Sequence, residues 1–571
     1  MHRTPPTARV ARNLVSAALL GAVFTAACTS TGESTVAQEE IAIAKLAETS
    51  RATAAPPPAP AAPLAAQAAY ADASSRTAYA RIPMPPMALH HPQPANTENY
   101  ARFDDNPVHR TSEQPLSTFS VDVDTGSYAN VRRMLVDGVR PPADAVRAEE
   151  FINYFDYGHP APTSSEVPFR VSTELAPAPW NAGRQLLMIG IKGYDVPRAE
   201  LPPANLVLLV DTSGSMQSAD KLPLLKRAMG MLVRQLRPQD TVSIVVYAGA
   251  AGLVLPPTAG DRQGEILAAL DRLHAGGSTN GGAGIQLAYD MARQGYVEDG
   301  VNRILLATDG DFNVGTVDQG ALETLVADQR KSGIALTTLG FGSGNYNDAL
   351  AERLADLGNG NHAYIDSALE ARRVLVEAMG STLLTIASDV KIQLEFNPAV
   401  VAEYRLVGYE NRLLRNEDFA NDSVDAGEIG AGHQVTALYE ITPVGSPAAR
   451  VPPLRYGETT PAPGSTEEVA HLRLRYKQPG SNASQLIETP IRRSQLRARP
   501  SDSLRFAGAV AGFADALRGG TRTDGWDWDG ILASARAAGG QVDPRRAEFV
   551  ELVEQARALI GAGDPVEIVS E

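Results

Sequence analysis

Five side chains with oxygen donors, carried by three separate segments, have the types and spacing needed to hold a metal ion. Asp211, Ser213 and Ser215 form the pattern Asp-x-Ser-x-Ser, Thr279 closes a Gly-Gly-Ser-Thr segment, and Asp309 lies in a Thr-Asp-Gly segment. A set made only of oxygen donors favours a hard cation over a soft one. Mg²⁺ fits best, because it is small and keeps several waters beside a few protein oxygens. We therefore predict a site for Mg²⁺, or for Mn²⁺ as its usual substitute.

The segments that must bring these residues together alternate between strands and helices. Apolar runs predict strands at residues 206–210, 242–247, 304–307, 334–341 and 362–365, and helical spacing predicts helices at 221–236, 264–273, 283–294, 322–332 and 348–356. This alternation predicts an α/β domain whose parallel sheet is covered on both faces. Loops that follow parallel strands meet at the carboxyl edge of the sheet, where ligands collect. We expect the three segments to converge at that edge.

In this order and context, the five residues resemble the metal-ion-dependent adhesion site (MIDAS) of the von Willebrand factor type A (VWA) fold, with no residue of the motif missing. The resemblance implies a Rossmann-like, doubly wound and mostly parallel sheet, with the VWA domain at residues 204–384. Because the hydroxyl ligands are neutral, a bound ion keeps charge with which to capture a carboxylate of another molecule. The site thus predicts adhesion or scaffolding through protein binding, with a protein or polymer as the ligand. The alternative is a polar cluster that caps helices and holds no ion.

Catalytic residues are not apparent, and we expect that the protein is not an enzyme. Ser213 does not lie in a Gly-x-Ser-x-Gly segment, and the sequence has no His-Glu-x-x-His pair. His274 lies near Thr279 in the sequence, but a loop histidine without a special role is the simpler interpretation. Two alternatives from other functional classes stay open: a metal-dependent hydrolase that uses the same ion, and a VWA adaptor for an assembly ATPase.

Two other acidic segments resemble ion-binding loops only in part. The segment Asp-Gly-Asp-Phe-Asn that begins at Asp309 starts like an EF-hand loop, but Gly320 stands where that loop needs a glutamate. Asp122 and Asp124 end a predicted strand at 119–123, and a turn explains them. We expect no calcium site in the first segment and a turn in the second.

The N-terminal residues have the pattern of a bacterial export signal. Arg3, Arg9 and Arg12 precede an apolar run at 14–27, and small residues lead to Cys28, the only cysteine of the chain. The pattern predicts a signal peptide at 1–27 and resembles the bacterial lipobox, which implies lipid attachment to Cys28. An ordinary signal peptide that leaves a free cysteine is the alternative.

The segment after the cysteine, residues 28–97, is rich in Ala and Pro and is predicted to be a tether. No later apolar run is long enough to span a membrane, so we expect no transmembrane helix after the signal. The expected location is the bacterial cell envelope, with the protein exported and membrane-anchored through its lipid.

The rest of the chain is predicted to form two flanking modules, a small α/β module at 98–203 and a β-rich, then helical, C-terminal domain at 385–571. Together with the VWA domain, they resemble a family of bacterial VWA lipoproteins that have an N-terminal von Willebrand-related region and a C-terminal domain of unassigned function. A helix at 369–384 is expected to close the VWA domain and, by this resemblance, to pass ligand binding on to the C-terminal domain. The formal net charge of −15 disfavours nucleic acid as a partner.

Overall fold

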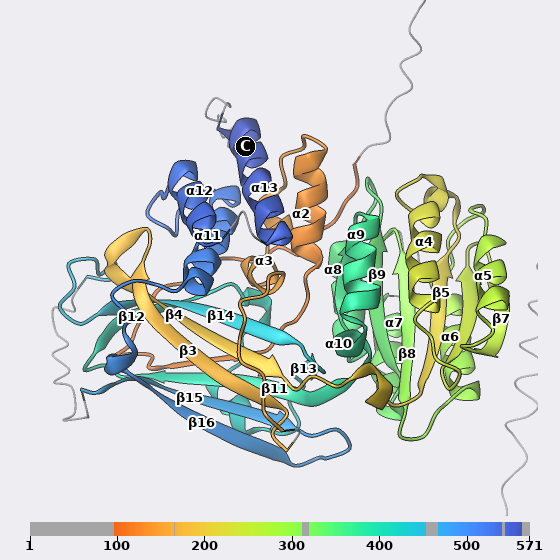
Figure 1. Ribbon diagram of the computed structural model, residues 1–571, viewed down its shortest axis with the longest axis horizontal. Coiled ribbons are helices and arrows are strands. Elements are labelled where there is room, and N and C mark those ends of the chain that lie inside the picture. Colours follow the sequence, from red (N-terminus) through yellow and green to blue (C-terminus); the bar gives the residue numbers. More distant parts are fainter. Residues whose placement is uncertain (1–95, 165, 311–318, 453–465, 540–542, 562–571) are drawn as a thin grey trace, which may run out of the picture. The chain divides into compact units, whose positions relative to one another are not determined.

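One six-stranded sheet organises the middle of the chain in the computed structural model, which describes residues 96–164, 166–310, 319–452, 466–539 and 543–561 (Figure 1). The strands, in their order across the sheet, are β10 (His362–Ile365), β9 (Ala335–Phe341), β8 (Val301–Thr308), β5 (Ala204–Asp211), β6 (Thr241–Tyr247) and β7 (Ala251–Ala259). All neighbours are parallel except β7, which is antiparallel to β6. Strand β7 was not predicted, because it contains Pro256 and Pro257, which a strand tolerates only at an edge such as this one.

Helices cover both faces of this sheet. On one face lie α4 (Leu222–Val233), α5 (Gln263–Asp271) and α9 (Ala368–Arg372), and on the other lie α6 (Gly281–Gln294), α7 (Gln319–Gln329) and α8 (Asp348–Leu357). Strand residues alternate between the two cores, so that Leu208 faces the first set of helices and Leu209 the second. This arrangement confirms the predicted doubly wound α/β fold.

The helix predicted at 369–384 is interrupted. After α9 the chain forms a π-helix, η5 (Arg373–Glu377), and then the short helix α10 (Met379–Leu383). A π-helix closes its hydrogen bonds over five residues instead of four, which the spacing of apolar side chains does not reveal. The prediction of one continuous helix was therefore wrong.

Two antiparallel sheets stack into a sandwich beside the VWA domain. The first sheet, in order, contains β1 (His109–Arg110), β12 (Val401–Val407), β14 (Gln434–Pro443), β4 (Asn181–Gly193) and β3 (Phe169–Ala178), and the second contains β13 (Gly427–Gly430), β11 (Thr385–Phe396), β15 (Glu468–Lys477) and β16 (Ser484–Arg492), with β2 (Leu116–Ser120) also paired to β11. Side chains such as Leu187, Tyr439, Ile392 and Leu472 fill the space between the two sheets.

Each of these sheets takes strands from both sides of the VWA domain in the sequence. Leu187 of β4 lies opposite Tyr439 of β14, and Phe119 of β2 lies opposite Ile392 of β11. Residues 98–203 and 385–571, expected as two modules, thus share their sheets and their core. The VWA domain is an insertion between two halves of one sandwich.

A layer of helices covers the outer face of the first sheet of the sandwich (Figure 1). It contains α2 (Gly126–Val136), α3 (Ala148–Asn153), α11 (Asp502–Leu517), α12 (Trp528–Ala537) and α13 (Pro544–Ile560). Aromatic rings hold the layer together: the ring centroids of Phe155 and Phe506 lie 4.9 Å apart, and those of Phe513 and Phe549 lie 5.3 Å apart. The ring centroids of Trp526 and Trp180 lie 5.8 Å apart, so Trp526 helps to anchor this layer.

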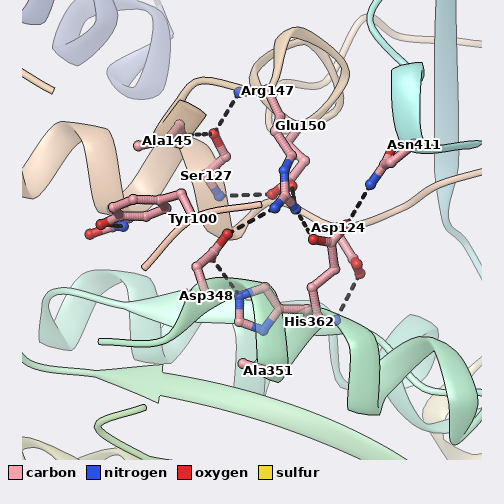
Figure 2. A network of polar contacts seen from close by, with 12 residues as sticks. Tyr100, Asp124, Ser127, Ala145, Arg147, Glu150, Asp348, Ala351, His362 and Asn411 are labelled. Atoms are coloured by element: carbon pink, nitrogen blue, oxygen red, sulfur yellow. Dashed lines mark hydrogen bonds and ion pairs between the residues drawn. The ribbon is translucent and has the colours of Figure 1, made fainter. Parts of the chain in front are cut away.

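Buried arginines of the flanking segments bind carboxylates of the VWA domain. Arg147, which directly precedes α3, pairs with Glu150 of α3 at 3.1 Å and with Asp348 of α8 at 3.0 Å (Figure 2). It also pairs with Glu352 of α8. Arg132 of α2 pairs with Asp366 at 2.7 Å through two nitrogens. Breaking buried pairs of this kind is costly because a charge is left without a partner. These contacts fix the VWA domain against its neighbours.

The acidic turn at Asp122 and Asp124 belongs to the same contact region. The backbone N–H of Asp124 donates to Asp122 Oδ1 at 2.9 Å, and Asp124 Oδ1 accepts the backbone N–H of His362 at 2.7 Å (Figure 2). Arg412 lies 3.0 Å from Asp122 and 3.6 Å from Asp124. The two aspartates therefore form a turn with a structural role, as expected.

The predicted signal peptide, Cys28 and nearly all of the predicted tether lie outside the described residues. Across the residues that the structure does describe, no helix combines the length and apolar character needed to cross a membrane.

Candidate functional site

The two carboxylates of the predicted metal site follow neighbouring parallel strands. Asp211 ends β5 and Asp309 comes directly after β8, and Val210 of β5 lies beside Ala307 of β8 in the sheet. Neither carboxylate is exposed to solvent. Strand pairing alone therefore brings two acidic side chains to one point at the carboxyl edge, as predicted.

The Asp-x-Ser-x-Ser segment turns sharply after β5. Asp211 Oδ1 accepts the backbone N–H of Ser213 at 2.8 Å, and the hydroxyl oxygens of Ser213 and Ser215 lie 2.9 Å apart. A short 3₁₀ helix, η3 (Gly214–Gln217), holds the second serine in place. Two hydroxyls and one carboxylate of a single loop thus face each other.

The loop that carries Thr279 is tied to this segment by backbone hydrogen bonds. The N–H of Gly276 donates to the carbonyl of Thr212 at 2.8 Å, and the N–H of Gly214 donates to the carbonyl of Gly277 at 3.0 Å. Thr279 is half-buried just before α6. In the described structure its hydroxyl makes no hydrogen bond to the other four site residues, although backbone hydrogen bonds tie its loop to the Asp-x-Ser-x-Ser segment.

Lys221 is a residue of the site that the sequence analysis did not identify. Its ammonium lies 2.9 Å from Asp309 Oδ2 and 2.7 Å from Asn345 Oδ1, and only 6% of the residue is exposed. The sequence analysis assigned this lysine only to the start of a helix. A signal was present, because a cation at a helix N-terminus is unfavourable and suggests a partner elsewhere.

The loop after β9 closes the site from the other side. Gly310 has φ +88°, and a Cβ there would lie 2.1 Å from the backbone nitrogen of Asn347, so only glycine fits. Residues that precede β1 hold this loop: the N–H of Thr97 donates to the carbonyl of Gly344 at 2.8 Å, and the N–H of Asn99 donates to that of Tyr346 at 2.9 Å. The environment of Asp309 therefore depends on a segment more than two hundred residues earlier in the chain.

Burial shapes the electrostatics of the site. Desolvation, together with the nearby charge of Asp309, raises the pKa of Asp211 to about 6, although hydrogen bonds from Ser213 act in the opposite direction. A cation near Asp211 would remove this penalty. The donor set, with two carboxylates and up to three hydroxyls, matches the oxygen ligands that Mg²⁺ and Mn²⁺ prefer.

The remaining candidates do not extend the site. His274 is exposed, and its Nδ1 lies 2.6 Å from the carbonyl of Arg272. The EF-hand-like segment runs largely through residues 311–318, outside the described residues. In the part of the chain that the structure covers, no three or more His, Cys, Asp or Glu side chains cluster in a way that would hold a metal.

Comparisons with known proteins agree with this fold. Residues 206–311 match the model of the von Willebrand factor type A domain, residues 94–188 match that of von Willebrand factor, and residues 381–559 match that of the C-terminal region of the uncharacterized protein YfbK. Fold and sequence together define a VWA-domain protein.

Relatives resolve the family further. The chain is 49% identical to the uncharacterized protein YfbK of Escherichia coli (strain K12) over 470 residues, which cover 81% of each chain. It therefore belongs to the YfbK family. It is also 32% identical to the uncharacterized protein sll0103 of Synechocystis over 188 residues, which cover 32% of this chain and 44% of that protein. Among solved structures, a von Willebrand factor type A protein from Catenulispora acidiphila is 15% identical, covers 68% of this chain and 96% of its own, and has a TM-score of 0.39.

Proposed function

We propose that this VWA-domain protein of the YfbK family binds an acidic group of a protein or polymer through a divalent cation, Mg²⁺ or Mn²⁺, held at the carboxyl edge of its six-stranded sheet. Asp211, Ser213, Ser215, Thr279 and Asp309 are the residues that would hold the ion. The role is adhesion or scaffolding, not catalysis. The protein acts in the bacterial cell envelope, where a lipid on Cys28 anchors it to a membrane.

One observation carries the proposal: two fully buried carboxylates, Asp211 and Asp309, lie at the ends of adjacent strands beside a pair of serine hydroxyls 2.9 Å apart. The negative charge of Asp309 is paired with the Lys221 ammonium, and that of Asp211, which forms no ion pair of its own in the described structure, favours a further cation. When bound, the ion would supply an electrophilic position that accepts an oxygen ligand from outside. Because the serine and threonine ligands are neutral, the bound ion would keep positive charge and would attract anions.

The ion is tested by titration calorimetry with Mg²⁺ and Mn²⁺ on the wild type and on a matched pair of variants. Ser215→Ala removes a proposed ligand, whereas Ser218→Ala removes an exposed hydroxyl that bonds only Asp220 in the same loop. We expect the first variant to bind the ion about tenfold or more weakly and the second to behave as wild type. Equal affinities for both variants, or no binding to the wild type, would contradict the proposal.

Capture of a ligand is tested separately with polyglutamate as an acidic polymer. Binding that requires Mg²⁺ and is lost in Ser215→Ala supports adhesion through the ion. Hydrolysis of ester or phosphate substrates that is lost in Asp309→Ala would favour the hydrolase instead. Retention of a labelled fatty acid by the wild type, and not by Cys28→Ala, tests the anchor; a cytoplasmic, unprocessed protein would revive the adaptor role for an ATPase.

A further inference from the structure

A cavity lies where the VWA domain joins the sandwich, well apart from the candidate metal site. Its volume is about 280 Å³, close to the lower end of the roughly 300–1,000 Å³ that small-molecule sites occupy. Part of its wall comes from β9 and from the helical link between the two bodies, and part from β4, β14 and the end of α3. Joints between domains are common places for ligand sites.

The helical link contributes its irregular turn to the cavity wall. Arg373, Val374 and Glu377 of the π-helix η5 line the cavity. π-helices are rare, cost hydrogen-bond geometry and occur frequently at functional sites. The π-helical turn therefore forms part of the cavity wall.

Three cationic side chains line the cavity, and one of them lacks a close carboxylate partner among the described residues. Lys192, Arg373 and Arg545 line it, against the carboxylates of Asp156 and Glu377. Arg545 forms an ion pair with Glu377 at 2.6 Å. Arg373 forms an ion pair, also at 2.6 Å, with Glu370, which does not line the cavity. The Lys192 ammonium donates to the carbonyl of Gly432, and its nearest carboxylate in the described structure, Asp195, is 4.0 Å away and largely exposed. Lys192 is therefore a cation with capacity for a further anion.

A second cation stands directly behind the wall. Arg303 of β8 is 3% exposed and donates to the hydroxyl of Thr337, which lines the cavity, at 2.7 Å. Its Nε has no hydrogen-bond partner among the described residues, and burial lowers the pKa of this guanidinium to about 10, with only partial compensation from Glu428. A buried guanidinium of this kind is stabilised by an anion nearby.

His433 and Gln434 are neutral side chains that also line the cavity. Burial, Lys192, Arg303 and Arg373 lower the pKa of His433 to about 3, so this residue of the cavity wall is neutral in a positive field. The Gln434 amide nitrogen donates to the carbonyl of Phe155 at 2.6 Å, which fixes the amide orientation, while its buried Oε1 has no hydrogen-bond partner in the described structure. Gln434 thus carries a covered acceptor that has no partner in the described structure, and Lys192 is the lining cation without a close carboxylate.

We propose that this cavity binds a small hydroxylated organic anion, a hydroxycarboxylate or a phosphate monoester, whose negative group faces Lys192 and whose hydroxyl donates to Gln434. At roughly 30 Å³ for each water-sized group, the volume of the cavity corresponds to about nine non-hydrogen atoms. Because VWA residues and sandwich residues share the wall, a bound anion fastens the two bodies together.

The test is thermal unfolding of the protein in excess chelator with malate, glycerol 3-phosphate, succinate or sodium chloride at equal ionic strength. Chelator keeps the outcome independent of the proposed cation site. We expect malate or glycerol 3-phosphate to raise Tm more than sodium chloride, and malate to exceed succinate, which lacks the hydroxyl. Which of the two anions acts identifies the carboxylate or the phosphate source. Shifts no larger than that of sodium chloride would overturn the proposal.

Matched lysine variants locate the effect. Lys192→Gln should weaken anion binding about tenfold, whereas Lys226→Gln, which removes a lysine that also donates to a backbone carbonyl but lies on α4, should leave it unchanged. Equal shifts in both variants would place the anion elsewhere. If Lys192→Gln does not fold, Gln434→Leu decides: it should abolish the preference for malate over succinate, and a retained preference would contradict the assignment.

Discussion

The Lys221 ammonium lies 2.9 Å from Asp309 Oδ2 in the interior of the protein. The chain thus places one of its own cations on a carboxylate that is also a candidate metal ligand. This lysine offsets part of the negative charge of the site, and it also repels any divalent ion that approaches Asp309. Lys221 therefore increases the stability of the metal-free protein and decreases its affinity for the ion.

Replacing this lysine should make the protein more dependent on metal. Lys221→Met leaves Asp309 without its ammonium partner, which for a buried pair costs about 3–5 kcal/mol of unfolding free energy in chelator. Removal of the positive charge should also strengthen cation binding, so the rise in Tm on adding Mg²⁺ should exceed that of wild type. Lys226→Met on α4 is the control. A smaller Mg²⁺ shift in Lys221→Met than in this control would show that Lys221 supports ion binding instead.

Acid should weaken metal binding through Asp211, whose pKa is raised to about 6. Below that pH the ion must displace a proton, so the apparent affinity should fall by up to about tenfold per pH unit, and above about pH 7 it should level off. In the metal-free protein the sign is reversed: the folded state binds the proton more tightly than the unfolded state, so stability falls as pH rises from about 4 to 6. Calorimetric titration across this range checks the slope. An affinity that is flat from pH 5 to 7 would mean that the ion does not contact Asp211.

The contact between the VWA domain and its neighbours should depend on Arg147. Arg147→Met leaves Asp348 and Glu150 buried without their partner, and we expect a loss of about 3–5 kcal/mol in urea unfolding. Arg262→Met, which removes an exposed pair with Glu265, should change stability by less than about 1 kcal/mol. If the two variants lose equal stability, the buried ion pairs of Arg147 do not stabilise the contact between the VWA domain and its neighbours.

Acid should also destabilise the sandwich through His159. This histidine packs over Gly190, where a Cβ would lie 2.1 Å from the ring, and its Nε2 lies 2.9 Å from the hydroxyl of Thr436. Burial lowers the pKa of His159 in the folded protein to about 4, whereas the pKa of an ordinary histidine is near 6.5. As the pH falls below about 6.5, the unfolded chain therefore takes up a proton before the folded protein does. Stability is full above that value and decreases by about 1.4 kcal/mol per pH unit below it.

His159→Gln should reduce this slope, measured by urea unfolding between about pH 4 and 7. The exposed His471→Gln serves as the control and should leave the slope unchanged. Identical slopes in both variants would assign the acid sensitivity to other groups.

The features that the sequence predicted are those set by local pattern. The apolar strands of the VWA sheet can be predicted from their own residues, without knowledge of the strands that they pair with. The order of strands and loops then predicts that Asp211 and Asp309 lie at the same edge of the sheet. The positions of Asp211 and Asp309 follow from that rule, whereas the orientation of the Thr279 side chain depends on torsions that spacing does not determine.

The features that the sequence did not predict depend on distant partners. Nothing in the residues of β4 indicates that they pair with β14, because an alternating strand fits many neighbours equally well. Lys221 was missed for a similar reason: its partners, Asp309 and Asn345, come from two later loops. The π-helix was not predicted, and one of the contacts of its Arg373 is to Thr125, a residue 248 positions earlier in the chain.

The insertion of the VWA domain between two halves of the sandwich sets the order in which the protein can be made. Strand β4 emerges before the entire VWA domain, whereas its partner β14 is synthesised only afterwards. At about 5–20 residues per second, the early strands wait on the order of ten seconds or more with open edges. Exposed edges recruit other strands, so a chain that stops after the VWA domain would be an aggregation hazard and not a functional fragment. Newly made chains of this protein are therefore expected to need a chaperone that shields β2, β3 and β4 until the C-terminal strands arrive.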